Sequence, residues 1–340
     1  EKTMKLKPIV AAIAVALGLG SASAQAEAEY TLTISSWGPP TSGINVSMWP
    51  QITKLIEEAT DGRVTTDLKL NLAPPPAQFD MILDGAADLT WIFHGYNPGR
   101  FVTAQLIELP GYDADSATLS AAYWQVYQDH FAKLNEHRGV KLIGLMTHGP
   151  GQLASASRIE NLSDIADLKI RTGGGVAGEV VGLLGGSRIQ LPAPSSYEAI
   201  SSKAADASMM TIEGRKSYNL VEVAPFMYEM PGGFYRGSFA LLMNQEKFDS
   251  MPKDIQEALD TVFGLETSRV AGTVWDEIDR EGRQATLDTP GNEIIVASPG
   301  DQAAFAKQAG GVKEKVFASI RDAGGDPEAA YAEISSLIAK

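Results

Sequence analysis

Arg171 ends the run Asp167-Leu168-Lys169-Ile170-Arg171, which has a strand-like pattern, and glycines follow it at 173–175. A guanidinium group presents planar paired donors that match both oxygens of a carboxylate, and it stays charged when it is desolvated. The glycines let backbone approach a ligand and lead into a helical pattern at 176–184, whose N-terminus would favour an anion. The alternative is an arginine that forms a surface salt bridge at the end of a strand.

Aromatic residues follow other segments with strand-like patterns. Together they could form an apolar box around the body of a ligand whose carboxylate is held by Arg171. Taken singly, each ring could equally belong to the core or to packing between lobes. The candidates are Trp37, Phe93, His94, Tyr96 and Phe234, with Tyr235 beside the last.

Thr211 and Glu213 follow the short apolar segment 207–211 and are further candidates for ligand contact. Glu213 could accept a hydrogen bond from a ligand hydroxyl or favour a cationic group. It could equally be an acid in the first turn of a helix near Arg215. Arg100 and Arg236 are additional basic candidates, although Arg100 could instead fix a loop.

The sequence lacks the usual signatures of catalysis. It contains no cysteine, and its four histidines, at 94, 130, 137 and 148, lack the His-Glu-x-x-His spacing of zinc enzymes. Gly-x-Ser-x-Gly elbows, dinucleotide fingerprints and phosphate loops are also missing. We therefore expect a protein with no catalytic residues, no metal and no cofactor.

The first 26 residues are typical of an export signal. Lys5 and Lys7 precede an apolar run at 9–19, and small residues at 22–26 offer a cleavage site, while residues 1–3 stand upstream of Met4. The apolar run is too short to span a bilayer. The net charge of −14 disfavours nucleic acid and anionic membrane surfaces as partners. These features predict a soluble periplasmic protein, in which an anionic ligand needs a local basic group.

Strand-like and helical patterns alternate along the chain and predict an α/β fold with a mostly parallel sheet. The expected strands cover 30–36, 64–72, 88–93, 140–146, 168–171, 207–211 and 239–244. The expected helices cover 45–59, 77–84 and 176–184, with another beginning in 197–203. Pro252 opens a helical stretch that runs unbroken from Lys253 towards Thr286 and could brace two lobes at once.

Five segments resemble, in order and spacing, the solute-binding proteins of tripartite ATP-independent periplasmic (TRAP) transporters, the dicarboxylate-binding-protein-like family. They are SSWGPPT at 35–41, QFDMILDGAAD at 78–88, HGYNPGRF at 94–101, DLKIR at 167–171 and FALLMN at 239–244. The resemblance implies a two-lobed periplasmic-binding-protein fold with mixed sheets, a ligand cleft between the lobes and a long bridging helix. It also assigns Arg171 the role of carboxylate clamp. The chain departs from the family at Ala207, where a glycine usually follows the aspartate.

The resemblance divides the chain into segments with different expected roles. These are a signal peptide at 1–26, lobe I at 27–150 with a return segment near 239–252, lobe II at 151–238, the bridging helix at 253–286, and a C-terminal segment at 287–340 that packs on the lobes.

The resemblance further implies a receptor that closes on a small organic carboxylate and delivers it to a membrane permease driven by an ion gradient. We expect the mature chain to be a monomer. Two alternatives remain open: an exported hydrolase or lyase with His94 or Glu213 as base, and a sensor that signals to a membrane kinase. The ligand could be an aromatic acid, a 2-oxo acid, a dicarboxylate or an onium zwitterion held by cation–π contacts. We favour a monocarboxylate with an apolar body.

Overall fold

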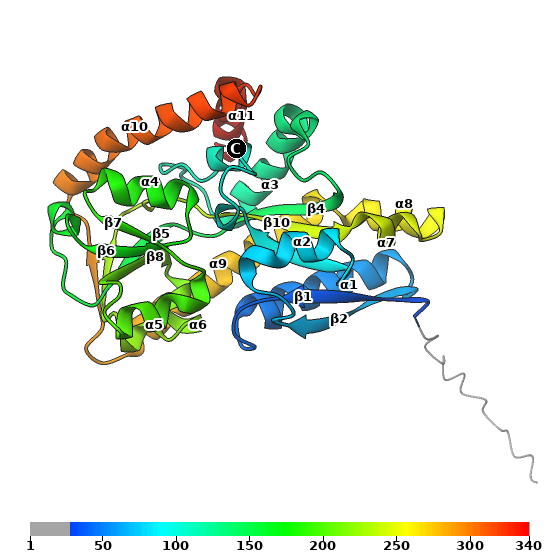
Figure 1. Ribbon diagram of the computed structural model, residues 1–340, viewed down its shortest axis with the longest axis horizontal. Coiled ribbons are helices and arrows are strands. Elements are labelled where there is room, and N and C mark those ends of the chain that lie inside the picture. Colours follow the sequence, from blue (N-terminus) through cyan, green and yellow to red (C-terminus); the bar gives the residue numbers. More distant parts are fainter. Residues whose placement is uncertain (1–27, 340) are drawn as a thin grey trace, which may run out of the picture.

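The computed structural model describes residues 28–339, which form two α/β lobes, each built on one β-sheet (Figure 1). The expected signal peptide at 1–26 lies outside the described residues. Within the described part of the chain, no helix is both long and apolar enough to cross a membrane.

The strands are β1 Tyr30–Ser36, β2 Val64–Leu70, β3 Leu89–Phe93, β4 Val140–Thr147, β5 Gly151–Ser155, β6 Lys169–Thr172, β7 Ser187–Gln190, β8 Ala207–Thr211, β9 Phe226–Glu229, β10 Ser238–Asn244 and β11 Glu293–Val296. The α-helices are α1 Trp49–Ala59, α2 Gln78–Leu83, α3 Ser116–Val126, α4 Gly175–Leu183, α5 Ser196–Ser201, α6 Glu213–Ser217, α7 Gln245–Asp249, α8 Lys253–Val262, α9 Leu265–Asp288, α10 Pro299–Asp322 and α11 Pro327–Ile338.

Lobe I is built on a five-stranded sheet in the order β2-β1-β3-β10-β4. Strands β1, β2 and β3 run parallel, as their alternation with helices predicts. Strand β10 runs antiparallel between β3 and β4, so the sheet as a whole is mixed, as the resemblance implied. The chain reaches β10 only after completing most of lobe II, and a local sequence pattern carries no signal for this return.

Lobe II is built on a six-stranded sheet in the order β11-β9-β5-β8-β6-β7. Strand β6 runs parallel to β7 and β8, whereas β5 is antiparallel to β8 and β9. Helix α4 follows β6 directly and packs against β6 and β7. The sheet therefore delivers the end of β6, with Arg171, to the side of lobe II that meets lobe I.

The helix expected to run unbroken from Lys253 is interrupted at Gly264, where φ is +98°. That conformation is incompatible with an α-helix but open to glycine. The Gly264 N–H donates to the Ile143 carbonyl at 2.7 Å, and a Cβ at this position would overlap the Trp124 ring. The prediction is wrong because close packing at Gly264 separates α8 from α9.

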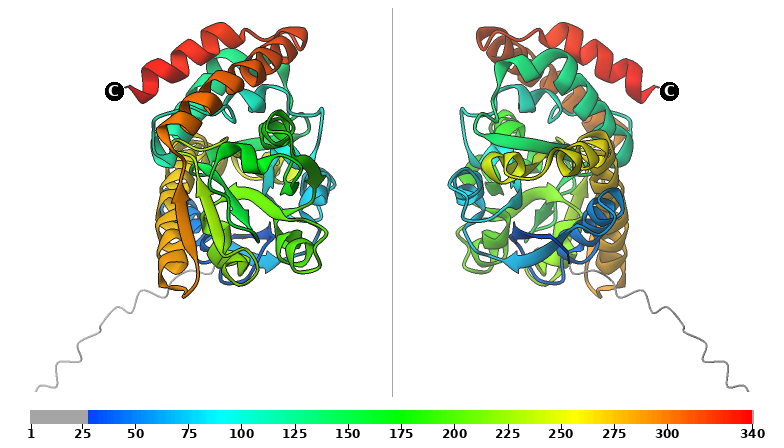
Figure 2. Two further views of the ribbon diagram at one scale, coloured as in Figure 1. Left: turned by 90° about the vertical axis from the view of Figure 1, so that its left-hand side faces the viewer. Right: turned by 90° about the vertical axis from the view of Figure 1, so that its right-hand side faces the viewer.

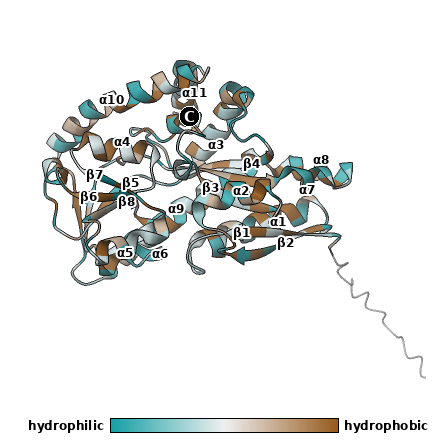
Figure 3. Cartoon of the chain, in the orientation of Figure 1, coloured by the Kyte–Doolittle hydropathy of each residue, from teal (hydrophilic) through white to brown (hydrophobic). Residues whose placement is uncertain are grey.

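Helix α9 packs against α3 and β4 of lobe I and against α6 and β11 of lobe II. Helix α10 then runs along the outside of lobe II, and α11 returns to pack on α3 (Figures 1 and 2). The outer helices α8 and α10 carry many hydrophilic residues, as Figure 3 shows. The apolar core continues across both lobes, since one cluster includes Leu145 of lobe I and Val180 of lobe II.

Candidate functional site

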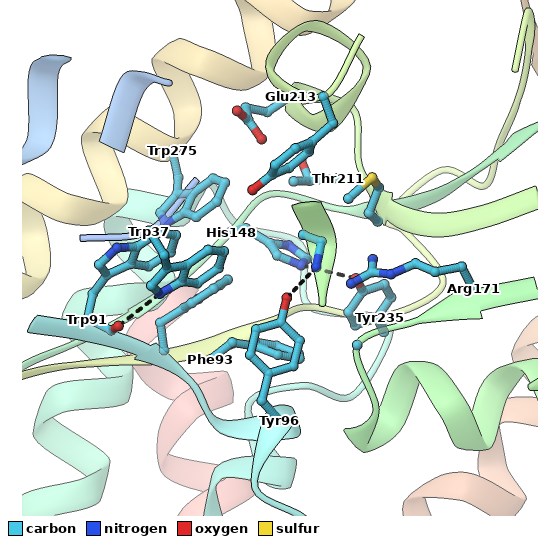
Figure 4. A pocket seen from close by; sticks show the side chains of 15 residues that line it. Trp37, Trp91, Phe93, Tyr96, His148, Arg171, Thr211, Glu213, Tyr235 and Trp275 are labelled. Atoms are coloured by element: carbon cyan, nitrogen blue, oxygen red, sulfur yellow. Dashed lines mark hydrogen bonds between the residues drawn. The ribbon is translucent and has the colours of Figure 1, made fainter. Parts of the chain in front are cut away.

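A pocket lies where the two lobes meet, and we call it the central pocket (Figure 4). Lobe I contributes Trp37, Trp91, Phe93, Tyr96 and Phe239; lobe II contributes Arg171, Gly173, Ala193, Met210, Thr211, Glu213 and Tyr218; His148, Tyr235 and Trp275 come from the connecting segments and from α9.

Arg171 is the only basic side chain other than a histidine among the described residues that line the central pocket. On β6 its side chain alternates with that of Ile170, which is buried in the core. The guanidinium donates to the Leu191 carbonyl, from Nε at 2.9 Å and from Nη2 at 2.6 Å. Arg171 is 2 % exposed and forms no ion pair with any acid of residues 28–339. Because a buried charge is costly without a counter-charge, this site favours an anion.

Aromatic rings form the walls of the pocket on the side of lobe I. Trp91 and Phe93 are two residues apart on β3 and therefore lie on one face of the sheet. The antiparallel register places Phe239 of β10 directly opposite Phe93, with ring centroids 5.1 Å apart. Trp37 follows β1 and stacks on Trp91. Sheet register thus builds a continuous aromatic surface that could cover the apolar body of a ligand.

Polar groups complete the pocket. The Tyr96 hydroxyl accepts a hydrogen bond from the Ala193 N–H at 2.8 Å, which joins the lobes at the pocket edge. His148 Nε2 lies 3.3 Å from the Tyr235 hydroxyl (Figure 4). Burial lowers the pKa of His148 to about 4, so its imidazole is neutral near pH 7. Arg171 is therefore the one fixed positive charge among the described lining residues.

Glu213 lies on lobe II at the start of α6 and also lines the central pocket. Burial raises the pKa of its carboxyl to about 7, and the neighbouring Asp279 adds to this increase, whereas a hydrogen bond from Ser217 opposes it. Asp279 in turn accepts hydrogen bonds from the Thr211 hydroxyl and the Glu213 N–H. This end of the pocket can therefore donate or accept a hydrogen bond near neutral pH.

Six of the eight side chains proposed from the sequence line the central pocket: Arg171, Trp37, Phe93, Tyr96, Thr211 and Glu213. The structure does not bring His94 and Phe234 into it. His94 turns away from its neighbour Phe93 and contacts Ser238 and His137, while Phe234 packs edge-on against Phe305 in the core. Neighbouring residues of an extended chain point to opposite sides, so Tyr235 lines the pocket instead of Phe234.

Sequence reasoning missed Trp91, His148, Ala193, Met210, Tyr218, Phe239 and Trp275. Trp91 could have been found, because it shares a strand face with Phe93. Trp275 could not, because it lies inside α9, away from any strand end, and no local pattern places that helix beside the pocket.

The sequence also predicted that the N-terminus of the helix after the glycines at 173–175 would favour an anion. In the structure, a carboxylate of the protein itself binds there. The N–H of Val176, in the first turn of α4, donates to the Glu108 carboxylate at 2.9 Å. The additional basic candidates are also engaged elsewhere. Arg100 lies over the Phe79 ring and pairs with Asp80, and Arg236 donates to the carbonyls of Tyr112 and Ala114. Among residues 28–339, no cluster of three or more acidic or histidine side chains could hold a metal ion.

Comparison with known proteins relates this architecture to one family. The profile of the bacterial extracellular solute-binding proteins, family 7, matches residues 41–320. A TRAP periplasmic solute-binding protein from Bordetella bronchiseptica, solved with bound (R)- and (S)-mandelate, superposes with a TM-score of 0.87. It is 33 % identical, and the match covers 91 % of this chain and 98 % of that one.

Two further relatives have similar architecture or sequence. A TRAP solute-binding protein from Rhodoferax ferrireducens, in complex with copurified benzoate, has a TM-score of 0.85 at 26 % identity over 91 % of this chain and 97 % of that one. The outer membrane transporter protein TsaT of Comamonas testosteroni is 28 % identical over 66 % of this chain and 67 % of its own length. The two-lobed fold, the matched profile and these relatives agree: the chain belongs to the family 7 bacterial extracellular solute-binding proteins, the periplasmic receptors of TRAP transporters, which are binding proteins for transport rather than enzymes.

Proposed function

We propose that the central pocket captures an aromatic monocarboxylate, with Arg171 on the carboxylate. The observation that carries this proposal is a buried guanidinium without an acidic partner among the described residues, inside an aromatic-lined pocket. The Leu191 carbonyl orients the group through Nε and Nη2. A guanidinium has five N–H donors, so others remain for both oxygens of a carboxylate.

Trp37, Phe93 and Tyr96 contact the apolar body of this ligand, and Thr211 and Glu213 meet its polar substituents. Ring-to-ring contacts favour a flat aromatic body over an aliphatic one of similar size. The bound mandelate and benzoate of the two relatives support the same class of ligand.

The charge of the pocket supports one carboxylate rather than two. No lysine and no second arginine belongs to the described lining residues, and Glu213 would repel a second carboxylate when it is ionised. An onium zwitterion is the second candidate, because the aromatic surface and the acid of Glu213 could hold its cationic group. Both ligand classes carry a carboxylate, and they differ in the rest of the molecule, which is uncharged in the aromatic acid and cationic in the zwitterion.

The lobes are proposed to close around the ligand and present this closed form to a membrane permease. Nearly all the described lining side chains are buried and they come from both lobes, as expected of a closed receptor. The receptor is proposed to be a monomer. Light scattering of the purified mature protein would test the oligomeric state.

A matched ligand panel tests the proposal by calorimetry. Benzoate and (R)-mandelate are expected to bind, benzyl alcohol tests the need for the carboxylate, and cyclohexanecarboxylate tests the need for a flat ring. Phthalate adds a second carboxylate, and glycine betaine represents the onium class. Tight binding of phthalate or betaine without binding of benzoate or mandelate would contradict the proposal. Mass spectrometry of the recovered ligand separates binding from turnover, since a receptor returns it unchanged.

A further inference from the structure

Glu108 is a buried acid that does not line the central pocket. It belongs to the segment between β3 and α3 in lobe I and is 1 % exposed. Its own backbone is fixed, because the carbonyl accepts a hydrogen bond from the Arg236 N–H at 2.9 Å. A buried carboxyl is costly unless its oxygens are satisfied, so its partners indicate what the fold gains from it.

The two carboxylate oxygens of Glu108 bind to different lobes. Oε1 accepts from the Ser238 hydroxyl at 2.5 Å, and Ser238 begins β10 in the sheet of lobe I. Oε2 accepts from the Val176 N–H at 2.9 Å, in the first turn of α4 in lobe II. Gly175 permits this approach, because a Cβ there would overlap Oε2. A single side chain therefore ties α4 to lobe I.

A chain of hydrogen bonds within lobe I holds Ser238 in place. His94 Nδ1 lies 3.1 Å from Ser238 Oγ, His94 Nε2 lies 2.9 Å from His137 Nε2, and Tyr127 Oη lies 3.1 Å from His137 Nδ1. Burial lowers the pKa of both histidines, that of His137 to about 3, so each carries one ring proton. When the Ser238 hydroxyl donates to Glu108, its oxygen can accept a hydrogen bond from His94 Nδ1–H. His94 Nε2 then accepts from His137 Nε2–H, and His137 Nδ1 accepts from the Tyr127 hydroxyl. Every group then has a partner.

Burial raises the pKa of Glu108 to about 7, while its hydrogen bonds from Ser238 and Val176 oppose the shift. The contact with α4 survives a change in ionisation. If Oε1 binds a proton, that proton is donated to Ser238 and Oε2 remains an acceptor for the Val176 N–H. The tie between the lobes depends on an acceptor oxygen at this position.

The tied end of α4 adjoins the ligand pocket. Arg171 and Gly173 both line the central pocket, and the short loop after them leads directly to Val176. A second contact between the lobes lies beside this loop, where the Gln190 side chain of β7 donates to the Gly95 carbonyl at 3.2 Å, close to Gly174. Movement of α4 away from lobe I would therefore displace the backbone next to the clamp.

We propose that Glu108 is a positioning residue for ligand retention, which fastens the N-terminus of α4 to lobe I when the lobes close and so holds the loop behind Arg171 around the ligand. The inference rests on the proposed function in one respect, namely that the ligand is held by Arg171. The Glu108 carboxylate thus occupies the position at the N-terminus of α4 where an anion would bind. The ligand carboxylate therefore binds Arg171 and not this helix N-terminus.

Replacement of the carboxyl separates this role from ordinary packing. Glu108→Ala removes both acceptor oxygens, and we expect the dissociation rate of benzoate or (R)-mandelate to rise about 10- to 100-fold, the range for lost hydrogen bonds to a charged group. The association rate should change little, as is usual for interface variants. Glu108→Gln keeps an acceptor for Val176 and a donor for Ser238, so its dissociation rate should stay within about threefold of wild type. Stopped-flow tryptophan fluorescence measures both rates.

Glu136 provides the matched control. It is also a largely buried acid that accepts from backbone N–H groups, those of Val102 and Thr103, but all of these partners lie in lobe I. Glu136→Ala should lower the melting temperature and leave the dissociation rate unchanged. An unchanged rate in folded Glu108→Ala would overturn the proposal. So would Glu108→Gln releasing ligand as fast as Glu108→Ala, or Glu136→Ala showing the same acceleration.

Amide hydrogen exchange of the ligand-free protein gives a second readout, because it reports the fraction of time that the lobes are closed and the Val176 N–H is protected. The peptide containing Val176 should exchange faster in Glu108→Ala than in wild type, while the peptide containing Val102 should not. Equal protection at Val176 in the two proteins would count against the tie. If wild type binds no member of the carboxylate panel, yet Glu108→Ala still loses protection at Val176 relative to wild type, the proposed ligand class is contradicted and the contact between the lobes stands.

Discussion

Trp37 and Trp91 stack with ring centroids 3.8 Å apart and planes only 5° from parallel, and the Trp37 indole N–H donates to the Trp91 carbonyl at 3.0 Å. Both rings line the central pocket, and both belong to the apolar core of lobe I. The wall that faces the ligand is therefore also part of the structure that stabilises the lobe. A ring at this position contributes both to folding and to ligand choice.

Trp37→Ala should consequently have two effects. It should cost about 3 to 5 kcal/mol of folding free energy, as expected for a buried aromatic ring, and it should reduce the preference for benzoate over cyclohexanecarboxylate. Trp49 offers a matched control, because it is buried in the same lobe but does not line the central pocket. Urea melts and calorimetry of both variants check this prediction. The same ligand ranking in Trp37→Ala and Trp49→Ala would remove Trp37 from the site.

Tyr96→Phe tests the hydrogen bond across the pocket edge. The change removes the acceptor of the Ala193 N–H and keeps the ring, so we expect a loss of about 0.5 to 1.5 kcal/mol in binding free energy. Tyr112→Phe is the control, since that hydroxyl donates to the Leu106 carbonyl within lobe I. Calorimetry should show weaker binding only in Tyr96→Phe. A similar loss in the two variants would mean that the contact between lobes has no specific role.

Stability should fall as pH rises through the pKa of Glu213. The folded protein raises this pKa from 4.5 to about 7, so it binds the proton more tightly than the unfolded chain does. The resulting stabilisation is complete below about pH 4.5 and is lost as pH rises through about 7. Glu108, whose pKa is also raised to about 7, acts in the same direction. The buried histidines, with lowered pKa values, oppose this effect only below about pH 6.5.

Melting temperatures of the ligand-free protein check this pH dependence. Wild type should melt at a higher temperature at about pH 6.5 than at about pH 8. Glu213→Gln removes the titrating group and should show a smaller difference between the two conditions. A variant with the same pH slope as wild type would show that Glu213 does not titrate in this range.

The sequence predicted the local elements near the site well, because their patterns are strong. The segments with strand patterns at 30–36, 88–93 and 207–211 correspond to β1, β3 and β8. The resemblance implied that the chain returns to lobe I near 239–252, but the pairing and register of distant strands were not predictable from local patterns. β10 inserts antiparallel next to β3, and that register brings Phe239 opposite Phe93, although the two residues are far apart in the chain.

The candidate site was predictable where a residue lies near or directly after the end of a strand, as for Arg171 on β6 and Trp37 after β1. The prediction failed where the sequence had to decide which of two adjacent aromatic residues lines the pocket. Phe93 and Tyr235 line the pocket, while His94 and Phe234 point elsewhere, and only the backbone conformation decides between such neighbours. The break at Gly264 was visible as a glycine, but the rings and carbonyls that require it come from distant segments.

The most direct test of the carboxylate clamp is calorimetry of Arg171→Ala with benzoate or (R)-mandelate. Truncation of a desolvated charge pair costs about 2 to 5 kcal/mol, so affinity should fall by at least about 100-fold while the protein stays folded. Arg171→Lys should recover only part of this loss, because an ammonium group cannot present paired planar donors. Arg188 is exposed on the neighbouring strand and pairs with Glu179, so Arg188→Ala should bind like wild type. Near wild-type affinity in Arg171→Ala would contradict the central claim.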